Sequence, residues 1–110
     1  MRINLKNRDR LLKCNQLALE VYTKKLDFVE GQAITAIYAT IWALLFGGAY
    51  VEEKSNDDLT FEEVCDWCDE QIANSGKELI EACNMWTDSF VYQQWIDRAR
   101  EAVGLEKKSL

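Results

Sequence analysis

One uncharged stretch decides the fold: Ala33-Ile-Thr-Ala-Ile-Tyr-Ala-Thr-Ile-Trp-Ala-Leu-Leu-Phe-Gly-Gly-Ala-Tyr-Val51. Its length approaches the roughly 20 residues that a helix needs to span a bilayer. However, alanine, threonine and glycine dilute it, the Gly47-Gly48 pair disfavours helix near its end, and neither flank carries the basic cluster that fixes orientation in a membrane. We therefore interpret the stretch as the central helix of a folded core. A small membrane-associated protein is the weaker alternative.

As a helix, this stretch separates small side chains from bulky ones. The small ones form a stripe that permits close contact with a neighbouring helix: Ala36, Ala39 or Thr40, Ala43 and Gly47. The bulky ones are Ile34, Ile37, Tyr38, Ile41, Trp42 and Leu45. Because the helix is apolar nearly all round, it must be covered on several sides. A chain of 110 residues offers few neighbours for this, so we expect a homo-oligomer, or a bound client, to complete the cover.

The residues before the central helix allow two structures at their beginning. Ile3 and Leu5 alternate with polar residues, and Asn7-Arg8-Asp9 offers a turn, which together favour a short β-hairpin. A helix that runs from about Arg8 onward fits the same residues equally well. A helix over residues 16–26 follows in either case, with Asn15 as its N-cap.

The start of the next helix is specified by Leu59-Thr60-Phe61-Glu62-Glu63-Val64. Thr60 and Glu63 can form a capping box, and Leu59 can pack on Val64 as a hydrophobic staple. The apolar face of this helix should comprise Phe61, Val64, Cys65, Cys68 and Ile72.

A further break at residues 74–76 precedes another helix, for which Ser75 and Glu78 offer a second capping box. This helix should carry Leu79, Ile80, Cys83 and Trp86, then bend or restart around residues 87–89 and end at Gly104. The chain is thus predicted to be mainly α, with four to five helices around the central apolar helix and a short N-terminal β-hairpin as the open question. We expect a single helical domain over residues 1–104 and a frayed tail over residues 105–110.

Composition argues against several functions. The chain has no histidine, and it lacks glycine-rich phosphate loops and nucleophile-elbow patterns, so we expect no enzyme and no cofactor. The net charge of −6, with acidic residues concentrated between Glu52 and Met85, argues against nucleic-acid binding. The first residues contain no apolar signal segment, so we expect a cytoplasmic protein.

The segment Cys65-Asp66-Trp67-Cys68 has the spacing of a metal-binding pair, and with Cys14 and Cys83 it could form a four-thiolate zinc site. A second paired motif is missing, however, and both cysteines of the pair lie on the apolar face of their helix. Free cysteine in such a place behaves as a small hydrophobic residue. We therefore interpret these cysteines as core residues and predict no metal site.

Three segments carry a family resemblance. Ile3-Asn-Leu-Lys-Asn-Arg-Asp-Arg-Leu-Leu-Lys13 leads into Asn15-Gln-Leu-Ala-Leu-Glu-Val-Tyr-Thr-Lys-Lys25, an apolar helix over residues 37–47 follows, and Leu59-Thr-Phe-Glu-Glu-Val64 opens an acidic helix. In this order they resemble the phage tail assembly chaperones of long-tailed phages and prophages. The Trp-rich residues 86–95 and the uncharged length of the central helix depart from that pattern.

The resemblance implies a cytoplasmic protein of an infected or lysogenic bacterium that binds the long tape measure protein. Covering the exposed apolar segments of that client would keep it soluble during tail assembly. The alternative is a generic helical, homo-oligomeric scaffold or regulatory interaction protein.

For the contact surface, aromatic residues at the edges of helical faces are the candidates, because aromatic side chains are enriched at protein interfaces. These are Trp67, Trp86, Tyr92 and Trp95. The competing interpretation places each of them in the core.

Overall fold

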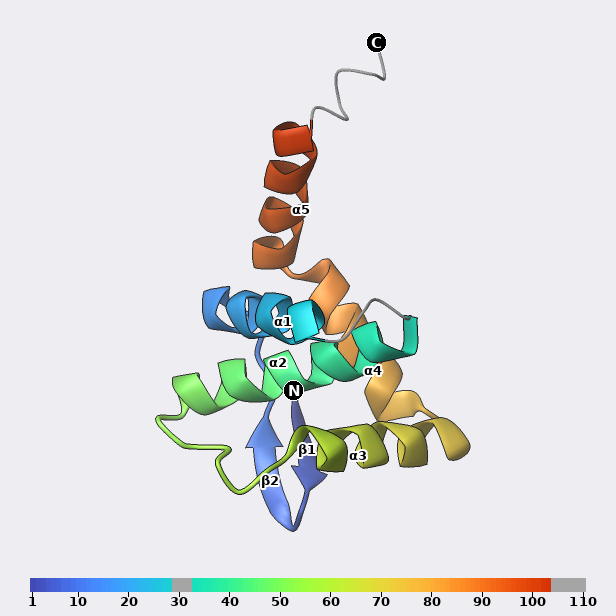
Figure 1. Ribbon diagram of the computed structural model, residues 1–110. Coiled ribbons are helices and arrows are strands. Elements are labelled where there is room, and N and C mark those ends of the chain that lie inside the picture. The colour runs from blue at the N-terminus through green and yellow to red at the C-terminus, as the bar shows by residue number, and fades with distance from the viewer. Residues whose placement is uncertain (29–32, 104–110) are drawn as a thin grey trace.

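The computed structural model describes residues 1–28 and 33–103. Across these residues an antiparallel hairpin is followed by helices (Figure 1). The elements are β1 (Arg2–Leu5), β2 (Arg8–Leu11), α1 (Gln16–Phe28), α2 (Ala33–Val51), α3 (Phe61–Ala73), α4 (Lys77–Asp88) and α5 (Phe90–Val103). The prediction of a mainly helical fold is confirmed, and the open question at the N-terminus is answered by the hairpin.

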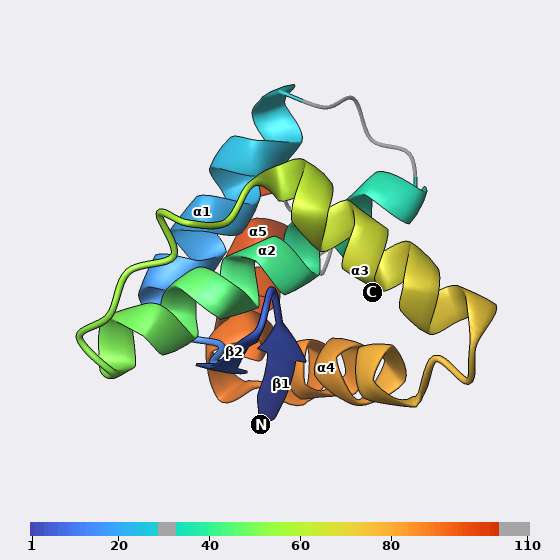
Figure 2. The same ribbon diagram turned by 90° about the horizontal axis from the view of Figure 1, so that it is seen from below.

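Helix α2 lies at the centre, in contact with α1, α3, α4 and strand β2 (Figures 1 and 2). Its middle portion is buried: Ala39, Thr40, Ile41, Ala43, Leu44, Leu45, Gly47 and Gly48. The chain itself thus covers the middle of this helix on several sides, while Tyr38, Trp42 and Phe46 are only half-buried. Its last turn is the exception, because Tyr50 and Val51 are exposed. Within the described part of the chain, no helix has both the length and the apolar character needed to cross a membrane.

The Gly47-Gly48 pair does not end α2, which continues to Val51. The reason is the close approach of the segment that follows the hairpin. A Cβ on Gly48 would lie 1.8 Å from the carbonyl oxygen of Leu11, and one on Gly47 would lie 2.2 Å from that of Lys13. The Lys13 amide also donates to the Leu44 carbonyl, at 3.1 Å. Glycine is thus required for packing, which outweighs its poor helix propensity.

The hairpin turns one residue earlier than predicted. Lys6 and Asn7 have positive φ angles of 52° and 60°, as in a two-residue type I′ turn, whereas Arg8 and Asp9 belong to β2. The register pairs Ile3 with Arg10, and both side chains are buried. One face of this hairpin therefore packs into the core.

A buried arginine ties the hairpin to the loop after α2. Arg10 donates from Nε to the Leu5 carbonyl at 2.9 Å, from Nη1 to Asn56 Oδ1 at 2.9 Å, and from Nη2 to Asp58 Oδ2 at 2.8 Å. Asn56, itself buried, donates to the Leu45 carbonyl of α2 at 2.8 Å. The hydrogen bond from Arg10 lowers the pKa of Asp58 to about 2. Each polar group of the network thus has a partner, as burial requires.

The predicted helix starts are confirmed in two of three cases. Asn15 accepts from the amide of Ala18, and Thr60 and Glu63 form the full capping box. The second box is wrong: α4 begins after Gly76, whose φ is 68°, and no side chain caps it.

The predicted apolar faces of α3 and α4 are slightly too wide, because Ile72 and Ile80 are exposed. The restart between α4 and α5 is confirmed, since α4 ends at Asp88 and α5 begins at Phe90. The predicted stop at Gly104 and the tail of residues 105–110 lie outside the described residues.

Candidate protein-binding surface

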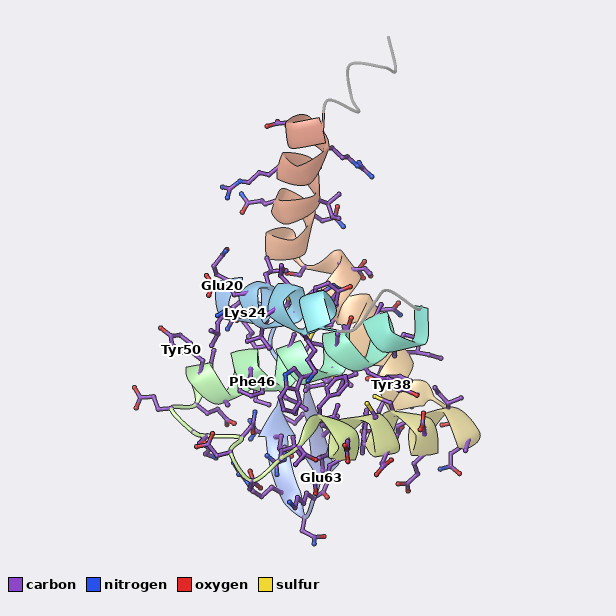
Figure 3. The ribbon with its side chains drawn as sticks, viewed as in Figure 1. Glu20, Lys24, Tyr38, Phe46, Tyr50 and Glu63 are labelled. Atoms are coloured by element: carbon purple, nitrogen blue, oxygen red, sulfur yellow. The ribbon has the colours of Figure 1, made fainter. Side chains whose placement is uncertain are left out.

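Four aromatic residues recur at intervals of four along α2: Tyr38, Trp42, Phe46 and Tyr50. This spacing brings them along one side of a helix, and we call them the aromatic stripe. The first three are half-buried, and Tyr50 is 70% exposed. Figure 3 shows Tyr38, Phe46 and Tyr50 following one another along α2, between α1 and α3. The stripe is an aromatic surface that the chain covers only in part.

Trp42 lies at the centre of a ring cluster that joins three helices. Its ring centroid is 4.8 Å from that of Phe46 and 5.6 Å from that of Phe61, which it meets edge-on at 89°. Lys25 of α1 places its Nζ 4.0 Å from the Phe61 centroid and 5.4 Å from the Trp42 centroid, within range of cation–π attraction. The middle of the stripe is therefore held in place by α1 and α3.

A groove opens beside the stripe. It has a volume of about 260 Å³ and is lined by Val21, Lys24 and Lys25 of α1 and by Trp42 of α2. Lys24 also borders a second groove, of about 240 Å³, on the outer side of α1. Figure 3 shows Glu20 and Lys24 on that helix. An apolar side chain from a partner could lie on Trp42 with lysines at its rim.

The two ends of the stripe differ. Tyr38 donates its hydroxyl proton to Asp69 of α3, and this hydrogen bond raises the pKa of Tyr38 to about 12. At the other end, the Tyr50 hydroxyl has no hydrogen-bond partner among the described residues. Tyr38 thus fastens the stripe to the fold, whereas Tyr50 is free to make new contacts.

Of the four aromatic residues chosen from sequence, the two whose side chains the structure describes, Trp67 and Trp86, do not belong to this surface. Trp86 is 3% exposed and its ring lies 4.9 Å from that of Tyr22, so its prediction as an edge residue is wrong and it belongs to the core. Trp67 is half-buried and borders a groove of about 250 Å³ near the hairpin turn. The side chains of Tyr92 and Trp95 lie outside the described part of the structure, although their backbone belongs to α5.

The aromatic stripe was missed because Tyr38 and Trp42 were interpreted as bulk for the core, and Phe46 and Tyr50 were not considered with them. The signal that could have revealed it is the unbroken four-residue spacing from Tyr38 to Tyr50. A buried helix gains little from a row of four rings that includes two phenol hydroxyls, because each buried hydroxyl needs a partner.

The cysteines lie among core groups. Cys14 and Cys68 are buried, Cys65 and Cys83 are half-buried, and all four are free thiols. Burial raises the pKa of Cys68 to about 12 and raises the pKa of the other three thiols as well. Burial thus opposes the thiolate form that metal binding and nucleophilic attack both use. In residues 1–28 and 33–103, no three cysteine or carboxylate side chains gather as a metal site would require.

The basic side chains of the hairpin are used within the chain. Arg2 pairs with Glu52 at 2.9 Å, Lys6 with Glu63 at 2.9 Å, and Arg8 with Asp58 at 3.0 Å. These pairs hold the hairpin against the loop and the start of α3. By contrast, neither Lys24 nor Lys25 forms an ion pair with a carboxylate whose side chain the structure describes.

Comparison of the chain with protein-family models, with curated proteins and with solved structures found no match. The aromatic stripe and the groove beside it are therefore the basis on which a function can be assigned.

Proposed function

We propose that this chain is a non-enzymatic assembly chaperone that holds an apolar helical segment of a larger client through the aromatic stripe. The observation that carries the proposal is the row of neighbouring aromatic residues along the central helix, Tyr38, Trp42, Phe46 and Tyr50, with Tyr50 70% exposed. Aromatic residues dominate the binding energy of protein interfaces. An amphipathic helix that docks on another protein presents anchors at three- and four-residue spacing, the same spacing as the stripe.

The surroundings of the stripe suit a holding function. Contiguous apolar surface on a folded chain commonly marks an interaction site. Trp42 is fixed between Lys25 and Phe61, so little side-chain entropy would be lost when a client binds there. The open groove beside Trp42 leaves room for a client side chain.

The client we propose is the tape measure protein of a phage or prophage, in the cytoplasm of the infected or lysogenic bacterium. Support comes from the resemblance of the hairpin, the first two helices and the capped start of α3 to tail assembly chaperones. A long chain with exposed apolar segments would aggregate unless those segments were covered during assembly.

A homo-oligomeric scaffold is a second candidate, favoured by one separate observation. Ile72, in the last turn of α3, and Ile80, in the first turn of α4, are 56% and 57% exposed. The turn that joins α3 to α4 lies on the opposite side of the molecule from the end of α2 (Figures 1 and 2). A second copy could cover this pair. Sedimentation of the purified protein tests this candidate. If a second copy covers Ile72 and Ile80, the wild-type chain should be oligomeric and the Ile72→Ser/Ile80→Ser variant should be monomeric.

Co-expression with a phage tape measure protein, the proposed client, tests the proposal. The tagged wild-type chain should co-purify with that client, and the Phe46→Ser/Tyr50→Ser variant should lose it while keeping its helical circular dichroism. The Ile72→Ser/Ile80→Ser variant is the matched control, since it removes the same kind of exposed apolar surface elsewhere. Absence of a complex with the wild-type chain would refute the proposal.

A further inference from the structure

The rim of the groove beside Trp42 carries positive charge that the described chain does not neutralise. Lys24 is exposed, Lys25 is half-buried, and neither forms an ion pair with an acidic side chain that the structure describes, a set that excludes the side chains of residues 26–35. The four basic residues of the hairpin, in contrast, are all paired with carboxylates: Arg2, Lys6, Arg8 and Arg10. The lysines of α1 thus retain their capacity to pair with a partner.

The position of Lys25 favours pairing with a carboxylate of a partner. Its ammonium group lies over the rings of Phe61 and Trp42, which hold it at the edge of the groove. A cation over an aromatic face can still donate to an acceptor on its other side. Lys24 lies on the same rim, so one carboxylate, or two on neighbouring turns of a client helix, could reach both lysines.

The net negative charge of the chain strengthens the preference of an acidic segment for this groove over the rest of the surface. The net charge is −6, and α3 carries the exposed acids Glu62, Asp66 and Glu70. An acidic segment would therefore be repelled over much of the surface and attracted at this groove. Such contrast between attraction and repulsion selects the partner and its orientation.

We infer that the groove between α1 and α2 selects an amphipathic client helix in which a carboxylate lies one turn from an apolar anchor. The apolar side chain lies on Val21 and Trp42, and the carboxylate pairs with Lys24 and Lys25. This inference rests on the proposed function and specifies the chemistry of the client segment.

Two synthetic helical peptides test the inference. They share the same apolar anchors and differ only in glutamate or lysine at the positions that flank each anchor. Binding is followed by the anisotropy of a label on the peptide, at low ionic strength. The wild-type chain should bind the glutamate peptide about tenfold more tightly, because each surface ion pair contributes modestly and two are formed. Added salt should reduce the difference.

Charge reversal gives the sharper comparison. Lys24→Glu/Lys25→Glu should reverse the preference, and Lys24→Glu alone, which leaves the ring contacts of Lys25 in place, should remove part of it. The control Lys54→Glu/Lys77→Glu changes the net charge equally at exposed positions outside the groove and should keep the wild-type preference.

Equal binding of the two peptides, or a preference that charge reversal does not change, would overturn the inference. The inference would also be overturned if the tape measure protein bound the wild-type chain but neither peptide bound it. In that case the proposed function would still stand. If the tape measure protein does not bind the wild-type chain while the glutamate preference is observed, the proposed function fails and the recognition chemistry stands.

Discussion

Two sides of the same helix differ in what they contact. On one side of α2, Gly47 and Gly48 let the backbone of residues 11–13 approach so closely that a single added carbon would overlap it. On another side, the aromatic stripe presents large rings that α1 and α3 cover only in part. The two glycines thus determine how closely the helix packs against the hairpin segment. The partly uncovered rings of the aromatic stripe form the candidate binding surface.

The largest effect should come from Gly48→Ala. Alanine favours helix over glycine by about 1 kcal/mol, so propensity alone predicts stabilisation. The added Cβ would instead lie 1.8 Å from the Leu11 carbonyl oxygen, and we expect a loss of about 3 kcal/mol or more in the free energy of unfolding. Urea unfolding followed by circular dichroism measures it. A stabilised variant would show that the backbones are not in contact.

The buried anchor of the hairpin should give the next largest effect. Arg10→Ala removes the donors to Leu5, Asn56 and Asp58, and we expect the free energy of unfolding to fall by about 2 to 3 kcal/mol. Arg2→Ala is the control, because its ion pairs with Asp9 and Glu52 lie at the surface and should contribute much less to stability. If both variants lost the same free energy of unfolding, the buried contacts of Arg10 would not be the stronger ones.

Acid should weaken the contact between Arg10 and Asp58 and so lower the stability of the fold. The pKa of Asp58 is about 2 in the folded chain against an ordinary value of 3.8, so the folded chain binds this proton less readily than the unfolded chain. The resulting stability is present above about pH 4 and is lost as the pH falls towards 2. In Asp58→Asn this contribution should be missing at neutral pH, so its unfolding should depend less on pH over that window. Parallel pH profiles of the two proteins would refute this.

The smallest effect on stability should come from the aromatic side. Tyr50 is 70% exposed, so Tyr50→Ser should change the free energy of unfolding by less than about 0.5 kcal/mol. The affinity for the client should nevertheless fall about tenfold or more, because aromatic residues dominate interface energies. Calorimetric titration of the client segment measures this. A stable variant with wild-type affinity would remove Tyr50 from the binding surface.

Local chemistry in the sequence was sufficient to predict the helices and two of their caps. Asn15 and the Thr60–Glu63 box act within one turn of chain, so neighbours in the sequence determine them. The glycine pair was interpreted only as unfavourable for helix. The reason for the glycines is contact with the backbone of Leu11 and Lys13, which lie far away in the sequence.

The residues of the candidate binding surface were harder to predict for the same reason. Burial of Trp86 depends on Tyr22 of α1, and exposure of Tyr50 depends on where the chain leaves α2. The four-residue aromatic spacing indicates a row of rings along α2, but not how far the rest of the chain covers each ring. The tertiary arrangement of α1 and α3 around Trp42 makes that distinction.

The central claim is that the aromatic stripe contacts the client, and site-specific photo-crosslinking tests it most directly. A photoreactive phenylalanine analogue replaces Tyr50 in one sample and Ile80, an exposed apolar residue of α4, in another. After illumination of the complex with the tape measure protein, a covalent adduct should form from position 50 and not from position 80. An adduct from position 80 with none from position 50 would contradict the account.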